Sequence, residues 1–233
     1  MVTLNETWII GLIIVCSTLS VLMLIVVFLL KFINTYQSNH ALRIKHLLHQ
    51  LLVDYLLGDS LERKQIIEKI QRLNKSRFNK KILIDELLIL TNNFSGIYAA
   101  RVFQLYKDLQ LNELSLNKLR NPIWHQKLRG MYELSTLEYS EAFDEISDLI
   151  YHPHGEVRRN ARVSLIKLKK KDALMTLKDL EGSMSQWTYV SIIAILKQNP
   201  IKLTGDEIRR LKSAQNPYVK TLAYDLEQFA YAQ

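Results

Sequence analysis

The stretch EAFDEISDLIYHPHGEVRRNARVSL, residues 141–165, contains two amphipathic helical segments separated by the turn residues HPHG. Apolar residues recur at three- and four-residue spacing on both sides of the turn, which is the period of one helix face. Pro153 and Gly155 interrupt the pattern, because Pro lacks a backbone donor and Gly favours turns. The stretch therefore predicts a helical hairpin, with helices at about 140–152 and 155–170.

Apolar residues at the same spacing recur along nearly all of the chain beyond residue 46, divided by short polar or Gly- and Pro-containing separators. They predict further helices at about 47–57, 60–74, 78–92, 95–110, 121–138, 172–180, 185–198, 204–213 and 216–230. No window alternates apolar and polar residues between turn signals, so we expect no strand. The 233 residues include 7 Gly, 4 Pro and 1 Cys, which excludes collagen-like and disulfide-rich classes, and 48% hydrophobic residues argue against disorder. The sequence therefore predicts an all-α protein.

One short pattern repeats in the second half of the chain. A β-branched residue precedes a small residue by one helical turn, at intervals of 33 and 29 residues, in Val157/Ala161, Val190/Ala194 and Val219/Ala223. A single hairpin cannot bury its own apolar face, so hairpins repeated at such a period stack on their neighbours with the small residue at the close contact. The pattern favours a solenoid of stacked hairpins over a compact bundle.

These residues resemble the HEAT-repeat family, whose second helix opens with Val-Arg-x-x-Ala. The sequence VRRNA at residues 157–161 matches that opening, and NPYVKTLA at residues 216–223 is similar, with Lys in place of Arg. The middle copy departs from the family, because Ser191 stands where the family has a basic residue and Trp187 lies at the turn. The resemblance implies a right-handed α-solenoid of helical hairpins that binds other macromolecules along its faces, without catalytic residues.

The resemblance covers about residues 121–230 and divides the chain. Residues 121–233 are expected to be HEAT-like repeats, and residues 34–120 a helical region that begins the solenoid. Residues 1–33 differ in kind, because residues 8–30, WIIGLIIVCSTLSVLMLIVVFLL, contain no charge over 23 positions. A helix of that length covers about 34 Å, enough to cross a hydrocarbon core of about 30 Å. A cleaved signal peptide would need a basic start and a shorter apolar run, so we expect a single transmembrane helix.

The charges beside the apolar run predict its orientation. No Lys or Arg precedes it, whereas Lys31, Arg43 and Lys45 follow it. Because positive residues stay in the cytoplasm, we expect a single-pass protein with its N-terminus outside and its helical domain in the cytoplasm. Within the run, Cys16 and Ser20 form one small-xxx-small pair, which leaves self-association through this helix open beside a monomeric anchor.

The strongest basic stretch lies at residues 62–81, where eight cations and two carboxylates give a local charge of +6. The cations are Arg63, Lys64, Lys69, Arg72, Lys75, Arg77, Lys80 and Lys81. In a tethered protein, an anionic leaflet attracts each such residue by about 1 kcal/mol. We therefore expect contact with an anionic lipid surface or an acidic partner, with a plain solvated face as the alternative. Nucleic acid is the less favoured ligand, because Phe78 is the one aromatic residue among these cations.

A second charge pattern predicts compensation inside one hairpin. Residues 133–148 carry a charge of −6 and residues 149–171 a charge of +6, and adjacent helices of opposite sign would face each other. Glu141, Glu145 and Asp148 share one helical face, but a catalytic acid and base need a pocket and unequal environments. We therefore expect no catalytic residues in this region.

The remaining chemistry-bearing residues predict no metal and no cofactor. His46 with His49, and His152 with His154, lack a Cys or carboxylate at ligand spacing, and no phosphate-binding glycine loop is present. Aromatic residues at helical spacing are expected in the core, namely Tyr98, Phe103, Tyr106, Trp124, Phe143, Trp187 and Phe229.

These patterns together predict a non-enzymatic scaffold or adaptor that presents a cytoplasmic solenoid to a membrane-bound protein partner. The second helices of the hairpins are expected to line the contact face, with Arg158, Arg162 and Lys220 as partner-binding residues. The alternative is an accessory subunit of an enzyme, or an atypical lyase-like or nucleic-acid-modifying enzyme, which a deep polar concavity would favour. A third hypothesis is that the chain forms the front part of a longer solenoid.

Overall fold

The computed structural model describes residues 2–178, 184–198 and 200–231, and these contain helices and no strand, which confirms the all-α prediction. The helices of the first half are α1 (Val2–Leu57), α2 (Ser60–Leu73), α3 (Arg77–Asn93), α4 (Ile97–Asp108) and α5 (Leu111–Leu119). The second half holds α6 (Trp124–Thr136), α7 (Phe143–Ser147), α8 (Gly155–Leu168), α9 (Lys170–Lys178), α10 (Gln186–Gln198), α11 (Gly205–Lys212) and α12 (Pro217–Tyr231). Short 3₁₀ turns, η1 (Ser140–Ala142) and η2 (Asp148–Tyr151), flank α7.

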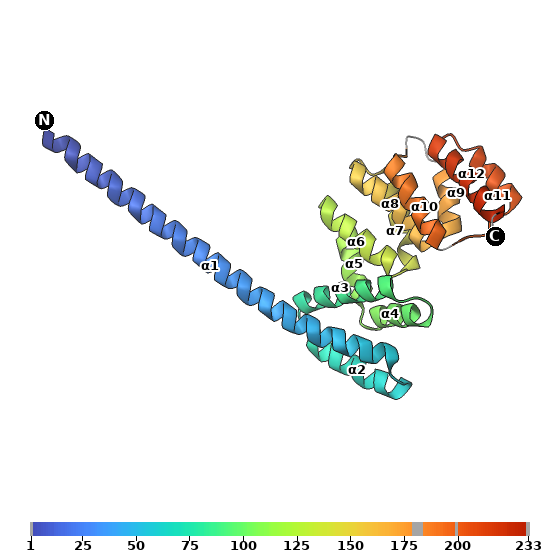
Figure 1. Cartoon of the computed structure of the whole chain (residues 1–233), viewed down its shortest axis with the longest axis horizontal. Helices are drawn as coiled ribbons and strands as arrows, with labels where there is room; N and C mark the ends of the chain where they lie inside the picture. The colour runs from blue at the N-terminus through green and yellow to red at the C-terminus, as the bar shows by residue number, and fades with distance from the viewer. Residues whose placement is uncertain (1, 179–183, 199, 232–233) are drawn as a thin grey trace.

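Helix α1 is one continuous helix of 56 residues, and its N-terminal part projects from the folded body as a free rod (Figure 1). The predicted apolar helix and the helix expected at 47–57 are therefore parts of one element, and the predicted boundary at residue 33 lies inside it. The sequence explains this continuity, because no Gly or Pro occurs between Gly11 and Gly58. The chain turns back at Gly58, whose N–H donates to the Asp54 carbonyl at 2.8 Å.

The body contains two hydrophobic cores. The first joins the end of α1, through Leu48 and Leu52, to buried side chains of α2, α3 and α4 and to Leu111 of α5. The second joins α6 to α12 and runs from Leu119 to Leu226. Tyr139, in the turn after α6, packs against both cores. The predicted division near residue 120 thus falls where one core gives way to the other along the chain.

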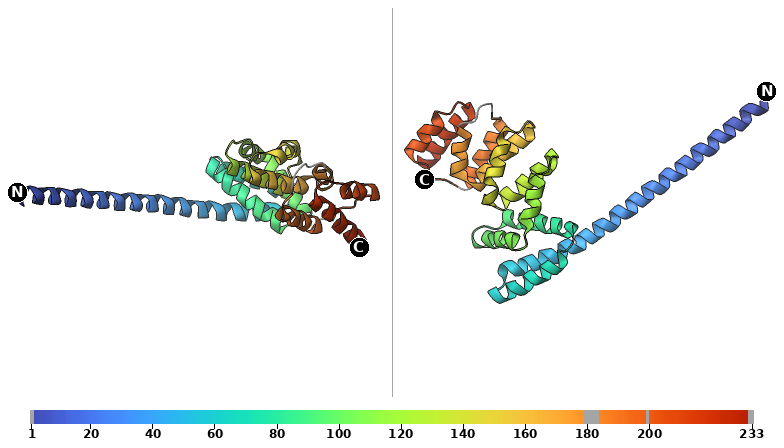
Figure 2. Two further views of the ribbon diagram at one scale, coloured as in Figure 1. Left: turned by 90° about the horizontal axis from the view of Figure 1, so that it is seen from above. Right: turned by 180° about the vertical axis from the view of Figure 1, so that it is seen from behind.

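Four helices of the second half begin at a constant interval. Helices α6, α8, α10 and α12 start at residues 124, 155, 186 and 217, so each begins 31 residues after the one before. Each packs on the next, α6 on α8, α8 on α10 and α10 on α12, and α3 packs on α6 at the head of the row. Helices α9 and α11 pack on each other in a second row. The views in Figure 2 show these helices succeeding one another away from α1.

This constant interval corrects the repeat predicted from the sequence. Val157 and Ala161 of α8 and Val219 and Ala223 of α12 are buried as expected. In α10, however, Val190 is 47% exposed and Ala194 is also exposed, while Thr188 and Ile192 occupy the core. The helix begins two residues earlier than the motif implies because Ser185 caps it, accepting from the Thr188 N–H at 3.3 Å. The unequal intervals of 33 and 29 residues thereby become two intervals of 31.

A small residue lies at a close contact between α5 and α6. Gly130 is the seventh residue of α6, just as Ala161 is the seventh residue of α8 and Ala223 the seventh residue of α12. A Cβ atom at Gly130 would lie 2.4 Å from the Leu119 nitrogen and 2.7 Å from the Ser115 carbonyl oxygen, both in the backbone of α5. Only glycine therefore permits α5 and α6 to pack this closely.

Replacing Gly130 tests this contact. Gly130→Ala should destabilise the body by about 2 kcal/mol or more, because the neighbouring atoms are backbone and cannot rotate away. The readout is the denaturant midpoint of the detergent-solubilised protein, followed by tryptophan fluorescence. Gly155→Ala is the matched control, since a Cβ there meets only the Arg158 guanidinium at 3.8 Å. Equal stability of the two variants would contradict the close approach.

Candidate functional site

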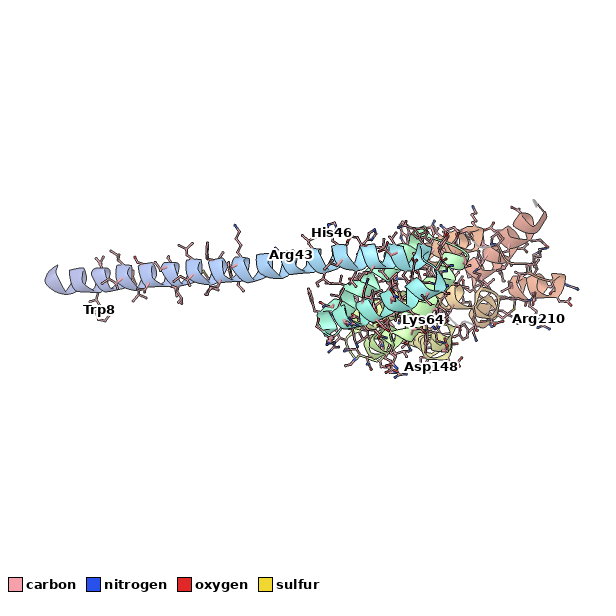
Figure 3. The ribbon with its side chains drawn as sticks, turned by 90° about the horizontal axis from the view of Figure 1, so that it is seen from below. Trp8, Arg43, His46, Lys64, Asp148 and Arg210 are labelled. Atoms are coloured by element: carbon pink, nitrogen blue, oxygen red, sulfur yellow. The ribbon has the colours of Figure 1, made fainter. Side chains whose placement is uncertain are left out.

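The free part of α1 presents a long, mostly apolar surface. Residues Gly11–Phe32 have a mean hydropathy of 3.0, and none of this segment is covered by the rest of the body. Trp8, at the free end, is also exposed (Figure 3). By length and composition this helix is suited to cross a membrane, since 22 residues span about 33 Å.

The predicted basic residues divide into two groups along α2 and α3. Arg63 and Lys64 lie in the first turns of α2, and Lys64 is seen on this helix in Figure 3. The other six lie in the last turns of α2, in the turn after it and in the first turns of α3. We name this group the cationic turn: Lys69, Arg72, Lys75, Arg77, Lys80 and Lys81.

The cationic turn is open to solvent and holds little compensating charge. Lys80 is half-buried and the other five side chains are exposed. Within the described residues, the structure records one ion pair for these six cations, between Arg72 and Glu68 at 3.7 Å. Because α2 folds back along α1, the turn lies at the end of the body from which the free rod projects (Figure 1).

The three predicted partner-binding residues have different environments. Arg158 is half-buried and its guanidinium donates to the carbonyls of His152 and Pro153, both at 2.7 Å. Arg162, on the same helix, is 6% exposed, and burial lowers its pKa. Lys220 on α12 is exposed. Arg158 therefore supports the turn before α8, and of the three only Lys220 presents its full side chain to solvent.

The acidic residues between 133 and 148 are compensated, but by a different partner from the one predicted. Glu141 pairs with Lys107 of α4 at 2.8 Å, and Glu145 pairs with Arg120 at 2.6 Å. These hydrogen bonds lower the pKa of both carboxyl groups. The cations after residue 149 pair elsewhere, for example Lys171 with Glu207 of α11. Glu141 and Glu145 therefore pair with residues that precede them in the chain and not, as expected, across one hairpin.

A buried carboxylate joins the helices where the two cores meet. Glu133 of α6 is fully buried and accepts hydrogen bonds from Ser115 at 2.6 Å, from Lys118 at 2.6 and 2.8 Å, and from Arg129 at 2.7 Å. Arg129 also pairs with Asp85 of α3. All acceptor positions of the Glu133 carboxylate are directed at donors of the protein itself, which is the condition for a stable buried charge.

The exposure of the aromatic residues departs from the sequence prediction. Tyr106 is buried, which raises its pKa, and Tyr98, Phe103 and Phe143 are half-buried. Trp187 is 78% exposed and Trp124 is 43% exposed, so the prediction that they are core residues is wrong. Trp124 instead stacks on His154, with ring centroids 4.6 Å apart. The side chain of Phe229 lies outside the described residues.

Beside the junction of the two cores lies a cavity of about 840 Å³. Its wall comes from the α3–α4 turn, from α4, from the turn after α6 and from the end of α10, and includes Asn93, Phe94, Gly96, Phe103, Glu138 and Gln198. Glu138 has φ +54°, in the left-handed region that favours glycine. It ends α6 in a Schellman turn, in which the Tyr139 N–H donates to the Leu134 carbonyl at 2.9 Å.

Within the described residues, no group of three or more His, Cys, Asp or Glu side chains could hold a metal ion. His152 and His154 contact each other instead, since the His154 N–H donates to the His152 ring at 3.1 Å. Comparison of the chain with protein-family models, with curated proteins and with solved structures finds no match.

The backbone at Glu138 gives a stability prediction. Glu138→Gly should stabilise the body by about 1 kcal/mol, because glycine adopts this conformation without the steric cost that a side chain adds. The denaturant midpoint measures the change. Glu113→Gly in α5, where the backbone is helical, is the matched control and should lose about 1 kcal/mol. A loss of stability in Glu138→Gly would show that its side chain contributes more than its backbone costs.

The pair between Lys171 and Glu207 gives a pH prediction. The Lys171 ammonium donates to Glu207 and, with the Thr204 N–H, lowers the pKa of Glu207 from 4.5 to about 2. Because the folded pKa lies below the unfolded one, the charge stabilises the fold above about pH 4.5 and this contribution is lost as the pH falls toward 2. Glu207→Gln should therefore have a lower denaturant midpoint than the wild type at pH 7 and about the same midpoint at pH 2. A difference that does not change with pH would contradict the pairing.

Proposed function

We propose that the chain is a single-pass membrane protein whose helical body is a cytoplasmic, protein-binding scaffold with no catalytic activity. The observation that carries the proposal is the continuity of α1. One helix supplies both the exposed apolar segment Gly11–Phe32 and the core residues Leu48 and Leu52. The anchor and the first core thus share one continuous helix, which would hold the body close to the membrane.

The surroundings of the apolar segment support the anchor and its orientation. An exposed apolar surface of this length is costly in water and favourable in lipid. In a helix, every interior backbone group is paired within the element, as the bilayer core demands. Lys31, Arg43 and Lys45 follow the segment, whereas no Lys or Arg precedes it, so the body belongs on the cytoplasmic side.

The constant interval of 31 residues supports a solenoid of the HEAT-like type that the sequence resembles. In such an arrangement each repeat contacts its neighbours, and the row of helices offers one extended surface. The contacts of α6, α8, α10 and α12 follow this order. Extended surfaces of repeat proteins bind other proteins, so a scaffold is the function that this arrangement favours.

The exposed face of α10 is the strongest candidate for the contact. Trp187, Val190 and Ala194 lie three and four residues apart and are all exposed, so they form one apolar stripe. Lys220 and Tyr224 are exposed on α12, which packs on α10. Tryptophan is enriched among the residues that dominate binding energy at protein interfaces.

The enzymatic alternative would use the cavity beside the junction of the two cores. Glu138 is the one carboxylate in its described wall, and no metal-binding group lies there among the described residues. The buried Glu133, which might otherwise act as an acid, is already held by Ser115, Lys118 and Arg129. A carboxylate saturated by the protein has no position left for a substrate, so the scaffold remains the proposal.

Capture of partners from intact membranes tests the proposal. Trp187→Ala should reduce cross-linked partners of the full-length protein by about tenfold or more, as loss of an interface hot spot does. Tyr151→Ala, which removes another exposed aromatic residue on η2, is the matched control and should leave capture unchanged. Wild type and variants should all resist extraction from the membrane by alkaline carbonate.

Two results would contradict separate parts of the proposal. Release of the wild type by carbonate would overturn the anchor. Equal capture by Trp187→Ala and Tyr151→Ala, with both variants folded, would overturn the assignment of the α10 face.

A further inference from the structure

We infer that the cationic turn binds the headgroups of anionic phospholipids and so forms a second membrane contact beside the anchor. The inference rests on the proposed anchor and adds to it a lipid class and a surface. It is carried by three independent observations: the uncompensated charge of the turn, its position on the body and its height above the proposed span.

The charge of the turn is available because the fold does not use it. Several cations elsewhere in the body are held by carboxylates, as in the pairs Lys107–Glu141, Arg120–Glu145 and Lys212–Glu227. In the cationic turn, the structure records Arg72–Glu68 as the one ion pair among its described residues. A cluster of four to eight Lys and Arg on the cytoplasmic side of a span is the pattern that attracts anionic lipid.

The helix dipole favours Arg72 in the last turn of α2, but it does not explain the cations that begin α3. The first turn of α3 contains no acidic residue, although acids are preferred where a helix begins, and it carries Arg77 and Lys80 instead. Cations at this end oppose the helix dipole, so they cost helix stability rather than adding to it. An external anion would relieve the same repulsion.

The fold places this charge toward the proposed membrane. Helix α2 turns back along α1, and the α2–α3 turn lies at the end of the body nearest to the free rod in both Figure 1 and Figure 2. The helices α9, α11 and α12 lie at the opposite end of the body. The cationic turn is therefore on the side of the body that would face the leaflet from which the anchor emerges.

The height of the turn agrees with this contact. The body begins where Ile44 packs on the first core, twelve residues after Phe32, which is about 18 Å along the helix. The headgroup region extends about 5–7 Å beyond the hydrocarbon, and the leaflet potential decays over about 8 Å more. Lysine and arginine side chains reach about 6 Å, and an ordinary tilt of about 20° lowers one side of the body further. A turn at this end of the body would thus lie within reach of the charged layer (Figure 1).

Energy transfer to labelled lipid tests the contact. The full-length protein, with Cys16→Ala and a fluorophore on Gln71→Cys, is inserted into preformed vesicles so that the body stays outside. The vesicles contain either phosphatidylcholine alone or phosphatidylcholine with about one third phosphatidylserine, and an acceptor on a lipid headgroup. Transfer from Gln71→Cys should be about twofold greater in the anionic vesicles and should fall in about 1 M salt.

Matched charge reversals identify the surface. Lys75→Glu, Arg77→Glu and Lys81→Glu together should abolish the difference between the two vesicles, since each lost cation is worth about fivefold in the contact equilibrium. Lys169→Glu, Lys202→Glu and Arg210→Glu remove three exposed cations elsewhere, and Arg210 lies far from Trp8 (Figure 3). This control should leave the transfer unchanged, as should moving the label to Gln215→Cys.

The outcomes separate the lipid contact from the anchor. Failure of the wild type to insert into neutral vesicles would overturn the anchor and this inference together. Stable insertion with equal transfer in both vesicles would overturn the lipid contact alone. The lipid contact is also overturned if the charge reversals leave the energy transfer intact. It is overturned as well if the reversals abolish binding of a single-stranded oligonucleotide while the transfer is the same in neutral and anionic vesicles.

Discussion

An unbroken ladder of backbone hydrogen bonds from Val2 to Leu57 is the constraint on which the rest of the structure depends. Near its N-terminus this helix carries apolar residues around its whole circumference. Near its C-terminus it is apolar on one side only, where Leu48 and Leu52 enter the first core. Between Gly11 and Gly58 there is no glycine or proline that would break or kink the helix. The apolar segment and the first core are therefore joined without an intervening loop.

The second half of the body is held to the first by polar as well as apolar contacts. Gly130 brings α6 against the backbone of α5, and three residues later Glu133 collects donors from Ser115, Lys118 and Arg129. Arg129 extends the network to α3 through Asp85. A buried charge with specific partners tolerates few alternative packings, so this network favours one angle between the two cores.

The sequence predicted the features that depend on local spacing. The helical class, the exposed apolar segment and most helix positions follow from apolar periodicity along the chain. The repeat register did not follow, because Val190 and Ala194 fit the motif while the Ser185 cap places Thr188 inside. The burial of Arg162 and the exposure of Trp187 depend on neighbouring helices, which one sequence does not specify. The basic stretch was visible in the sequence, but its place beside the rod depends on α2 folding back.

The continuity of α1 would make the proposed anchor a lever. Its apolar segment is about 33 Å long, which exceeds a hydrocarbon core of about 27 Å, so the segment would tilt more in a thin membrane than in a thick one. Because α1 is one continuous helix from the segment to the body, the body would follow such a tilt. Bilayer thickness would then be converted into the orientation of the α10 face, and the protein would present that face differently in different membranes.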